Sequence, residues 1–157
     1  MSAALTDTLR DAAVNTFEQM AFLLPDTAPD EQQLAQKVSA VASIIFTGPA
    51  SGILQVRACE GLLPVLATNM LGAEPRNQTL QLDALGEIAN MICGQIFPSI
   101  DPQQAFEQLP PQIRLYADVC ESSIAHPAAG VQLGIEGSRA DVLLYLFSSK
   151  LEVDGRD

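Results

Sequence analysis

Cysteine and histidine are scarce in this chain of 157 residues, which has three cysteines and one histidine. Cys59, Cys93 and Cys120 lie far apart and form no Cys-x-x-Cys pair, and His126 stands alone. This scarcity argues against a zinc site and more strongly against a disulfide framework. We expect buried free thiols in a reducing compartment, which indicates a cytoplasmic protein.

Basic residues are also few, since 8 Lys and Arg stand against 19 Asp and Glu and give a formal net charge of −11. A surface of this sign repels the phosphates of nucleic acids and the headgroups of anionic membranes. The composition therefore disfavours both nucleic acid and membrane surfaces as partners.

A signal peptide and a membrane span are not expected. Residues 1–10 lack a basic region followed by a long apolar run. Residues 38–56 carry no charge, but a turn-forming stretch, Thr47–Gly52 (TGPASG), interrupts them. Two strands joined by a turn explain this region better than a single spanning helix.

The length fits one domain, and 48% hydrophobic residues can form a real core. We expect one domain over 1–157, with an N-terminal helix at 4–24, a core at 34–148 and a frayed tail at 152–157. Hydrophobic periodicity predicts further helices at 60–71 and 78–97, and strands at 37–47, 52–58, 112–119, 131–136 and 139–147. Residues 25–33 and 98–111 are expected to be links, and Pro98 to end the helix before it. Helices and hairpins in this order predict an α+β fold, an antiparallel β-sheet packed against long α-helices.

The last expected strand is apolar on both faces beyond Asp141. Leu143, Tyr145 and Phe147 alternate with a second apolar set and need a cover, either a helix or another subunit. We therefore expect a homodimer. Gly137-Ser138 before this strand fits a type II′ hairpin turn with glycine first.

The most informative segment lies in the helix expected at 78–97. At about 100° per residue, Asp83, Glu87, Asn90 and Gly94 share one stripe of this helix. The opposite stripe is apolar and contains Leu82, Leu85, Ala89, Ile92 and Ile96. A carboxylate and a carboxamide one turn apart thus point the same way from a rigid element. A solvated helix face is the plain alternative for such a stripe.

Glycine is unusual inside a helix, and Gly86 and Gly94 each cost roughly 1 kcal/mol relative to alanine. Two such costs indicate the close approach of another backbone, from a partner or from a neighbouring helix. The apolar Ile88 and Met91 lie on a third face and are expected to belong to the core more often than to a contact surface.

The spacing Asp83-x₃-Glu87-x₂-Asn90, continued by Met91–Gly94 (MICG), resembles the motif of the CheC/CheX/FliY chemotaxis phosphatases, and within them the single-site CheX-like branch. Residues 66–72 (LATNMLG) resemble the helix end that precedes this motif, and the Gly48–Gly52 turn also fits. The likeness spans roughly residues 5–148 and is sharp from about 62 to 94. The proline that follows in the family would fall near Ile113, whereas this chain has Pro110 and Pro111.

The resemblance implies a protein phosphatase that removes the phosphoryl group from the aspartate of a CheY-like receiver domain. Asn90 would orient the attacking water, Glu87 would pair with the active-site lysine of the receiver, and Asp83 would support the surface. The receiver would hold the Mg²⁺, and this chain would bind no cofactor or metal. Phosphoryl transfer depends mainly on positioning and electrostatics, and a carboxylate and a carboxamide on a rigid helix can supply both.

Two other functions remain open at this point. The displaced proline and the single site also suit a non-catalytic module that binds a receiver or belongs to the flagellar switch. The two-sided apolar strand suits a generic structural dimer domain.

Overall fold

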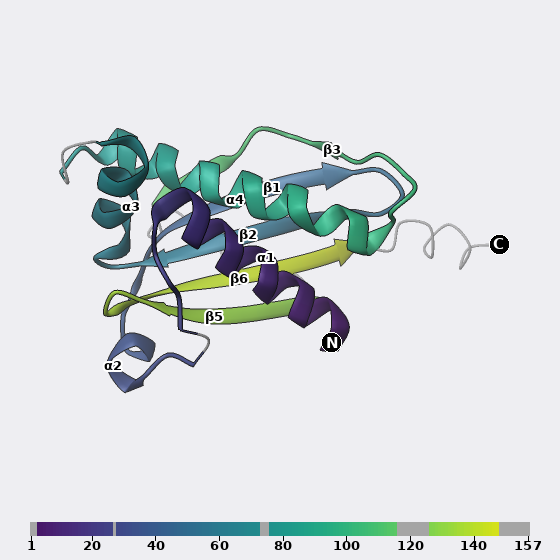
Figure 1. Cartoon of the computed structure of the whole chain (residues 1–157). Helices are drawn as coiled ribbons and strands as arrows, with labels where there is room; N and C mark the ends of the chain where they lie inside the picture. The colour runs from purple at the N-terminus through teal and green to yellow at the C-terminus, as the bar shows by residue number, and fades with distance from the viewer. Residues whose placement is uncertain (1–2, 27, 73–75, 116–125, 148–157) are drawn as a thin grey trace.

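The computed structural model describes residues 3–26, 28–72, 76–115 and 126–147. A six-stranded antiparallel sheet forms one layer, and the helices α1 (Ala3–Ala21) and α4 (Gln78–Ile100) lie across one of its faces, as Figure 1 shows. Buried side chains from the strands, α1, α4 and the shorter helix α3 (Leu62–Leu71) form one core cluster. The predicted α+β fold is confirmed.

The sheet has the order β3-β1-β2-β6-β5, and β4 pairs with β1 beside β3. The strands are β1 (Val38–Thr47), β2 (Ser51–Cys59), β3 (Glu107–Gln108), β4 (Gln112–Leu115), β5 (Ala129–Ile135) and β6 (Ser138–Phe147). The uncharged stretch at 38–56 forms the predicted β1–β2 hairpin. In the part of the chain that the structure describes, no helix is long and apolar enough to span a membrane.

Helix α4 follows the predicted pattern closely. The side-chain oxygen of Asn77 accepts a hydrogen bond from the Leu80 N–H at 3.1 Å and caps its start. The buried face is Ala84, Leu85, Gly86, Ile88, Ala89, Ile92, Cys93 and Ile96. The predicted end at Pro98 is wrong, because the helix continues to Ile100. Proline lacks the N–H of a helical residue and crowds the carbonyl of the preceding turn, and the packing of Phe97 and Ile100 against the core offsets this cost.

The first helix ends at Ala21 and not at residue 24, because Phe22 has the left-handed angle φ = 58°. The link expected at 25–33 contains the start of a short helix, α2 (Glu31–Leu34). Asp30 and Gln33 form a capping box at its start, which is a local signal that the sequence interpretation did not use. By contrast, α3 ends as predicted at Gly72, which has φ = 62°.

The turn between β5 and β6 corrects another prediction. Its central residues are Glu136 and Gly137, with φ of 49° and 78°, and Ser138 pairs with Ile135 inside the ladder. Two consecutive positive φ angles are typical of a type I′ turn and not of type II′. The Ser138 hydroxyl donates to the Glu60 carbonyl at 2.7 Å, which holds Ser138 in the strand.

The two faces of β6 differ in burial. Val142 and Leu144 join the core, whereas on the other face Leu143 is half-buried, Tyr145 is buried and Phe147 is 42% exposed. Of the strand predicted at 112–119, the structure describes only the part that forms β4. Outside the described residues lie the end of that strand, Cys120 and the predicted tail at 152–157.

Candidate functional site

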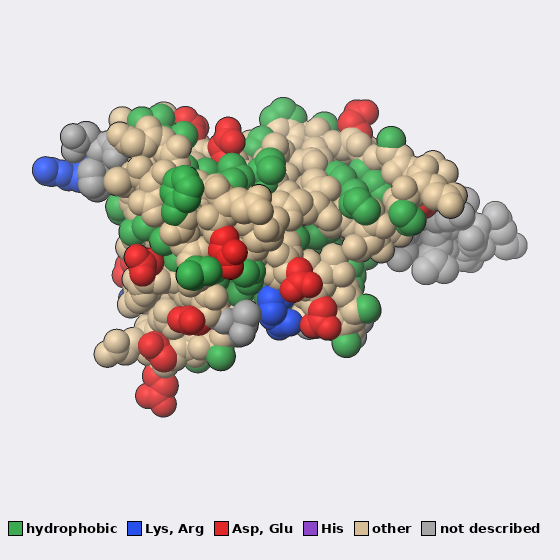
Figure 2. Space-filling model, in the orientation of Figure 1, with side chains coloured by type: hydrophobic (Ala, Val, Ile, Leu, Met, Phe, Trp, Pro, Cys, Tyr) green, Lys and Arg blue, Asp and Glu red, His purple; other side chains and the backbone are tan. Residues whose placement is uncertain are grey.

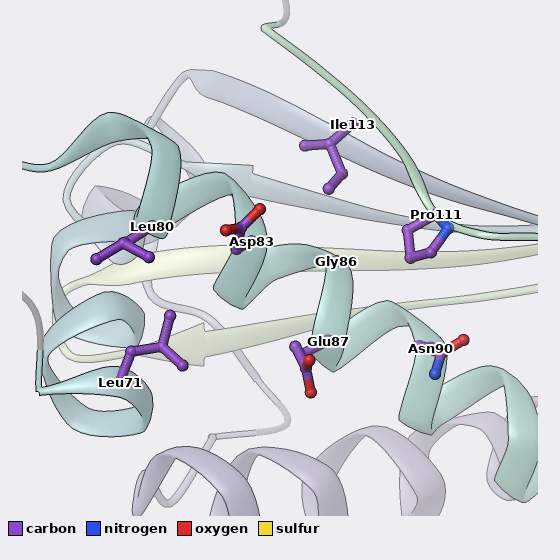
Figure 3. Close-up of a pocket in the computed structure, with 8 residues that line it drawn as sticks. All are labelled: Leu71, Leu80, Asp83, Gly86, Glu87, Asn90, Pro111 and Ile113. Carbon is purple, nitrogen blue, oxygen red and sulfur yellow. The ribbon is translucent and has the colours of Figure 1, made fainter.

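Asp83, Glu87 and Asn90 are all exposed on one side of α4, as their spacing predicts. They border a surface hollow that α3, α4 and the β4 region share (Figure 3). The residues that line it are Leu71, Leu80, Asp83, Gly86, Glu87, Asn90, Pro111 and Ile113. The structure therefore brings the predicted polar residues together beside apolar side chains, at a place where a partner can enter.

Gly86 lets the β4 region approach the helix. A Cβ atom at this position would lie 2.7 Å from Cδ1 of Ile113 and 3.4 Å from Cβ of Pro111. The expected approach of another backbone is wrong at this position, because the side chains of Ile113 and Pro111 occupy the space beside Gly86. The contact explains why α4 accepts a residue that lowers helix stability.

Pro111 lies at the hollow, although it comes two residues before the position where the family pattern has its proline. Pro111 and Ile113 both line the hollow, on the side opposite Leu71 (Figure 3). A proline ring therefore borders the polar stripe, although Ile113 occupies the position at which the family pattern predicts a proline.

Asn90 has a partner that the sequence interpretation missed. Nε2 of Gln108 in β3 donates to Oδ1 of Asn90 at 2.8 Å and approaches the backbone carbonyl oxygen of Asn90 at 3.3 Å. No local signal marks Gln108, because the linker before β4 also contains Gln103 and Gln104 and no clear periodicity. Its contact depends on pairing between β3 and the distant strand β1.

The charged side chains of the hollow are both acidic. Within the described ranges, neither Asp83 nor Glu87 forms an ion pair. Figure 2 shows acidic side chains spread over the face that carries α1 and α4, with few basic ones. Such a site favours a cationic group on a partner, and Glu87 can accept a charge-assisted hydrogen bond from it.

The site offers two carboxylates and a carboxamide but no reactive thiol. Cys93 lies on the buried face of α4, where burial raises the pKa of its thiol to about 12. Burial also raises the pKa of Cys59 to about 11, although Arg139 opposes the shift. Both thiols are therefore neutral at physiological pH. Among the described residues, no group of three or more His, Cys, Asp or Glu side chains is placed to hold a metal ion.

The two apolar residues on the third face of α4 separate in the structure. Ile88 is fully buried, as expected, but Met91 is 44% exposed, so its assignment to the core is wrong. Leu71 at the edge of the hollow is also 44% exposed. Apolar surface is therefore available to a partner near the polar stripe.

Comparison with known proteins agrees with this geometry. The family model described as "Chemotaxis phosphatase CheX" matches residues 40–127, which include the whole polar stripe. No curated protein matches the sequence.

Solved structures with the same fold include chemotaxis proteins from several bacteria. CheX from Desulfovibrio desulfuricans is 18% identical, with a TM-score of 0.73 over 92% of this chain and 99% of that one. CheX from Vibrio vulnificus is 21% identical, with a TM-score of 0.68 over 92% and 97%. CheX from Borrelia burgdorferi, solved as a complex with CheY, BeF₃ and Mg²⁺, is 13% identical, with a TM-score of 0.65 over 89% and 96%.

Proposed function

We propose, from the premise that this chain belongs to the CheX family of chemotaxis phosphatases, that it accelerates hydrolysis of the aspartyl phosphate of a CheY-like response regulator. The observation that carries the proposal is the exposed pair Glu87 and Asn90, which share one stripe of α4 at the edge of a partly apolar hollow. The complex of the Borrelia CheX with CheY supports a receiver of this kind as the partner.

In this proposal Asn90 enters the active site of the receiver and orients the water that attacks phosphorus. A carboxamide can accept a hydrogen bond from the water through Oδ1 or donate one through Nδ2, and it exchanges no proton. Because the receiver already holds the phosphoryl group and Mg²⁺, placing the water in line is the main contribution left to the phosphatase. The P–O bond breaks as the water oxygen attacks, which releases phosphate and restores the aspartate.

Glu87 fixes the approach of the receiver by pairing with its active-site lysine. The net charge of −11 offers no general attraction to a receiver site that is itself rich in aspartate. Recognition then depends on this local pair and on apolar contacts at the hollow. Asp83, one turn earlier, supports the same surface.

The direct test is the decay of a radiolabelled aspartyl phosphate on candidate receivers, with and without this chain. We expect faster loss of label at substoichiometric amounts of the chain. An unchanged half-life at saturating amounts, together with binding to the phosphorylated receiver, would instead favour the non-catalytic receiver-binding or flagellar-switch module. The absence of both effects would leave only a structural role.

Replacing Glu87 by Gln should lower kcat/KM for the phosphorylated receiver by about 10-fold, mainly through KM. That factor corresponds to about 1.4 kcal/mol, close to the lower end for a hydrogen bond to a charged group. Steady-state dephosphorylation measures it. Glu18→Gln is the matched control, because Glu18 is exposed on α1 and does not line the hollow. Equal losses in both variants would contradict the proposed pairing.

A homodimer is part of the proposal. On the second face of β6, Tyr145 is already buried within the chain, while Leu143 is half-buried and Phe147 is 42% exposed. We expect light scattering at micromolar concentration to give twice the mass of one chain, because burial of the exposed parts of Leu143 and Phe147 favours association. A monomer under these conditions would refute the dimer without affecting the proposed chemistry.

We also propose that the reaction takes place in the cytoplasm. Cys59 and Cys93 are buried free thiols. Unpaired cysteines are the norm in reducing compartments, where disulfides do not persist. Receivers phosphorylated on aspartate would be available to the chain in that compartment.

A further inference from the structure

We propose that Gln108 is a positioning residue for the proposed reaction: it fixes the side-chain carboxamide of Asn90 in one orientation before a receiver binds. This inference rests on the proposed function and extends it to a residue outside α4. The contact that carries it is the hydrogen bond from Nε2 of Gln108 to Oδ1 of Asn90, at 2.8 Å. A second approach, to the backbone carbonyl of Asn90 at 3.3 Å, places the Gln108 amide directly over this turn of the helix.

The helix makes room for Gln108 at Gly94. A Cβ atom at position 94 would lie 3.3 Å from Oε1 of Gln108, which is tighter than an ordinary van der Waals contact. Gly94 is one turn beyond Asn90 and is less favourable in a helix than alanine. The space that this glycine leaves is occupied by the amide that binds Asn90, so the unfavourable residue and the hydrogen bond belong to one arrangement.

The backbone around Gln108 is held on both sides. Gln108 pairs with Phe46 of β1, and the next residue, Leu109, donates its N–H to the Ile45 carbonyl at 2.9 Å. On the other side, the ring of Phe106 stacks on Phe97 of α4, with a centroid distance of 4.4 Å and an interplanar angle of 7°. Gln108 therefore reaches Asn90 from a fixed support, as a positioning residue must.

The two contacts of Gln108 together identify which end of the Asn90 carboxamide is the oxygen. The backbone carbonyl of Asn90 can only accept, so it faces Nε2 of Gln108, and the Asn90 side-chain atom beside the same Nε2 is then the acceptor Oδ1. Without the hydrogen bond to Oδ1, the group can rotate by 180° and exchange Oδ1 with Nδ2. A carbonyl oxygen has two lone pairs, so Oδ1 can accept from Gln108 and still accept from the attacking water, while both Nδ2 hydrogens stay available. Gln108 thus presents an ordered acceptor to the water, which reduces the reorganisation needed when the receiver binds.

Two substitutions at position 108 test this role. Gln108→Met keeps the length of the side chain but removes the donor, and a neutral hydrogen bond of about 1 kcal/mol predicts a fall in kcat of about 5-fold. Gln108→Glu keeps the shape but places a carboxylate against Oδ1, which favours the rotated carboxamide and should lower kcat by 10-fold or more. KM for the phosphorylated receiver should change little in either variant. Gln104→Glu, exposed in the same linker, is the matched control for added charge and should leave kcat unchanged.

A second measurement reports on the contact without any receiver. The side-chain amide NMR signals of Asn90, assigned by their loss in Asn90→Ala, should shift and broaden in both position 108 variants and stay unchanged in Gln104→Glu. Unchanged Asn90 signals, or kcat values within 2-fold of the parent, would overturn the inference. If the parent chain does not accelerate dephosphorylation, the proposed function fails, and the NMR signals alone decide whether Gln108 orders Asn90.

Discussion

Replacing Asn90 by alanine is expected to lower the turnover of receiver dephosphorylation by about 10²–10³, the usual loss when one positioned polar group is removed from a reacting centre. The side chain is exposed, and alanine favours a helix more than asparagine does. The variant therefore loses its contact with Gln108 and the group that orients the water, but nothing from the core.

Single-turnover decay of the labelled receiver, with the variant in excess, separates this chemical effect from weaker binding. Asn15→Ala is a close control, because Asn15 is also an exposed helical asparagine, and its Nδ2 donates to Oε1 of a glutamine, Gln95, at 3.3 Å. Thermal unfolding followed by circular dichroism should show both variants folded. If Asn90→Ala turns over as fast as the parent, the proposed mechanism is wrong.

The largest effect on stability is expected for Phe46→Ala. Phe46 is fully buried in β1, and its ring makes edge contacts with Phe97 and Phe106 at centroid distances of 5.3 and 6.1 Å. Deleting a buried phenyl ring leaves a cavity and typically lowers the free energy of unfolding by about 3–5 kcal/mol. Urea unfolding measures the change. Phe22→Ala, at a side chain that is 75% exposed, should change stability by less than about 0.5 kcal/mol.

Phe46→Ala should also affect catalysis at the site. Phe46 pairs with Gln108 across β1 and β3, and its ring contacts Phe97 in α4 and Phe106 just before β3. At a temperature where Phe46→Ala is still folded, its kcat should therefore also fall, with the Asn90 amide signals broadened. A large loss of stability with Asn90 signals identical to those of the parent would show that the aromatic cluster does not support Gln108.

Local periodicity was sufficient to predict the part of the site that lies on α4. The positions of Asp83, Glu87 and Asn90 follow from the 3.6-residue repeat of a helix, and the buried opposite face fixed its rotation. The β1–β2 hairpin was equally local, because the turn residues lie between two apolar runs. Each of these features depends on residues close in sequence, so one sequence can reveal it.

The parts that were missed depend on contacts between distant segments. Gln108 meets Asn90 only because a two-residue strand pairs with β1, and a strand that short has no periodicity to detect. Pro111 reaches the hollow through the same segment. Helix α4 passes Pro98 because Phe97 and Ile100 pack against the core, and a local rule that ends helices at proline does not include these distant contacts.

The hollow takes its walls from α3, α4 and the segment that leads into β4, which are separate stretches of the chain. The three residues Asp83, Glu87 and Asn90 at this spacing are therefore not sufficient to transfer the site to another protein. A surface helix of another protein that received these three residues would lack the apolar side chains of the hollow and the glutamine that binds the Asn90 carboxamide. A designer who wished to transfer this site would have to move the helix together with its flanking loop and the strand that anchors it.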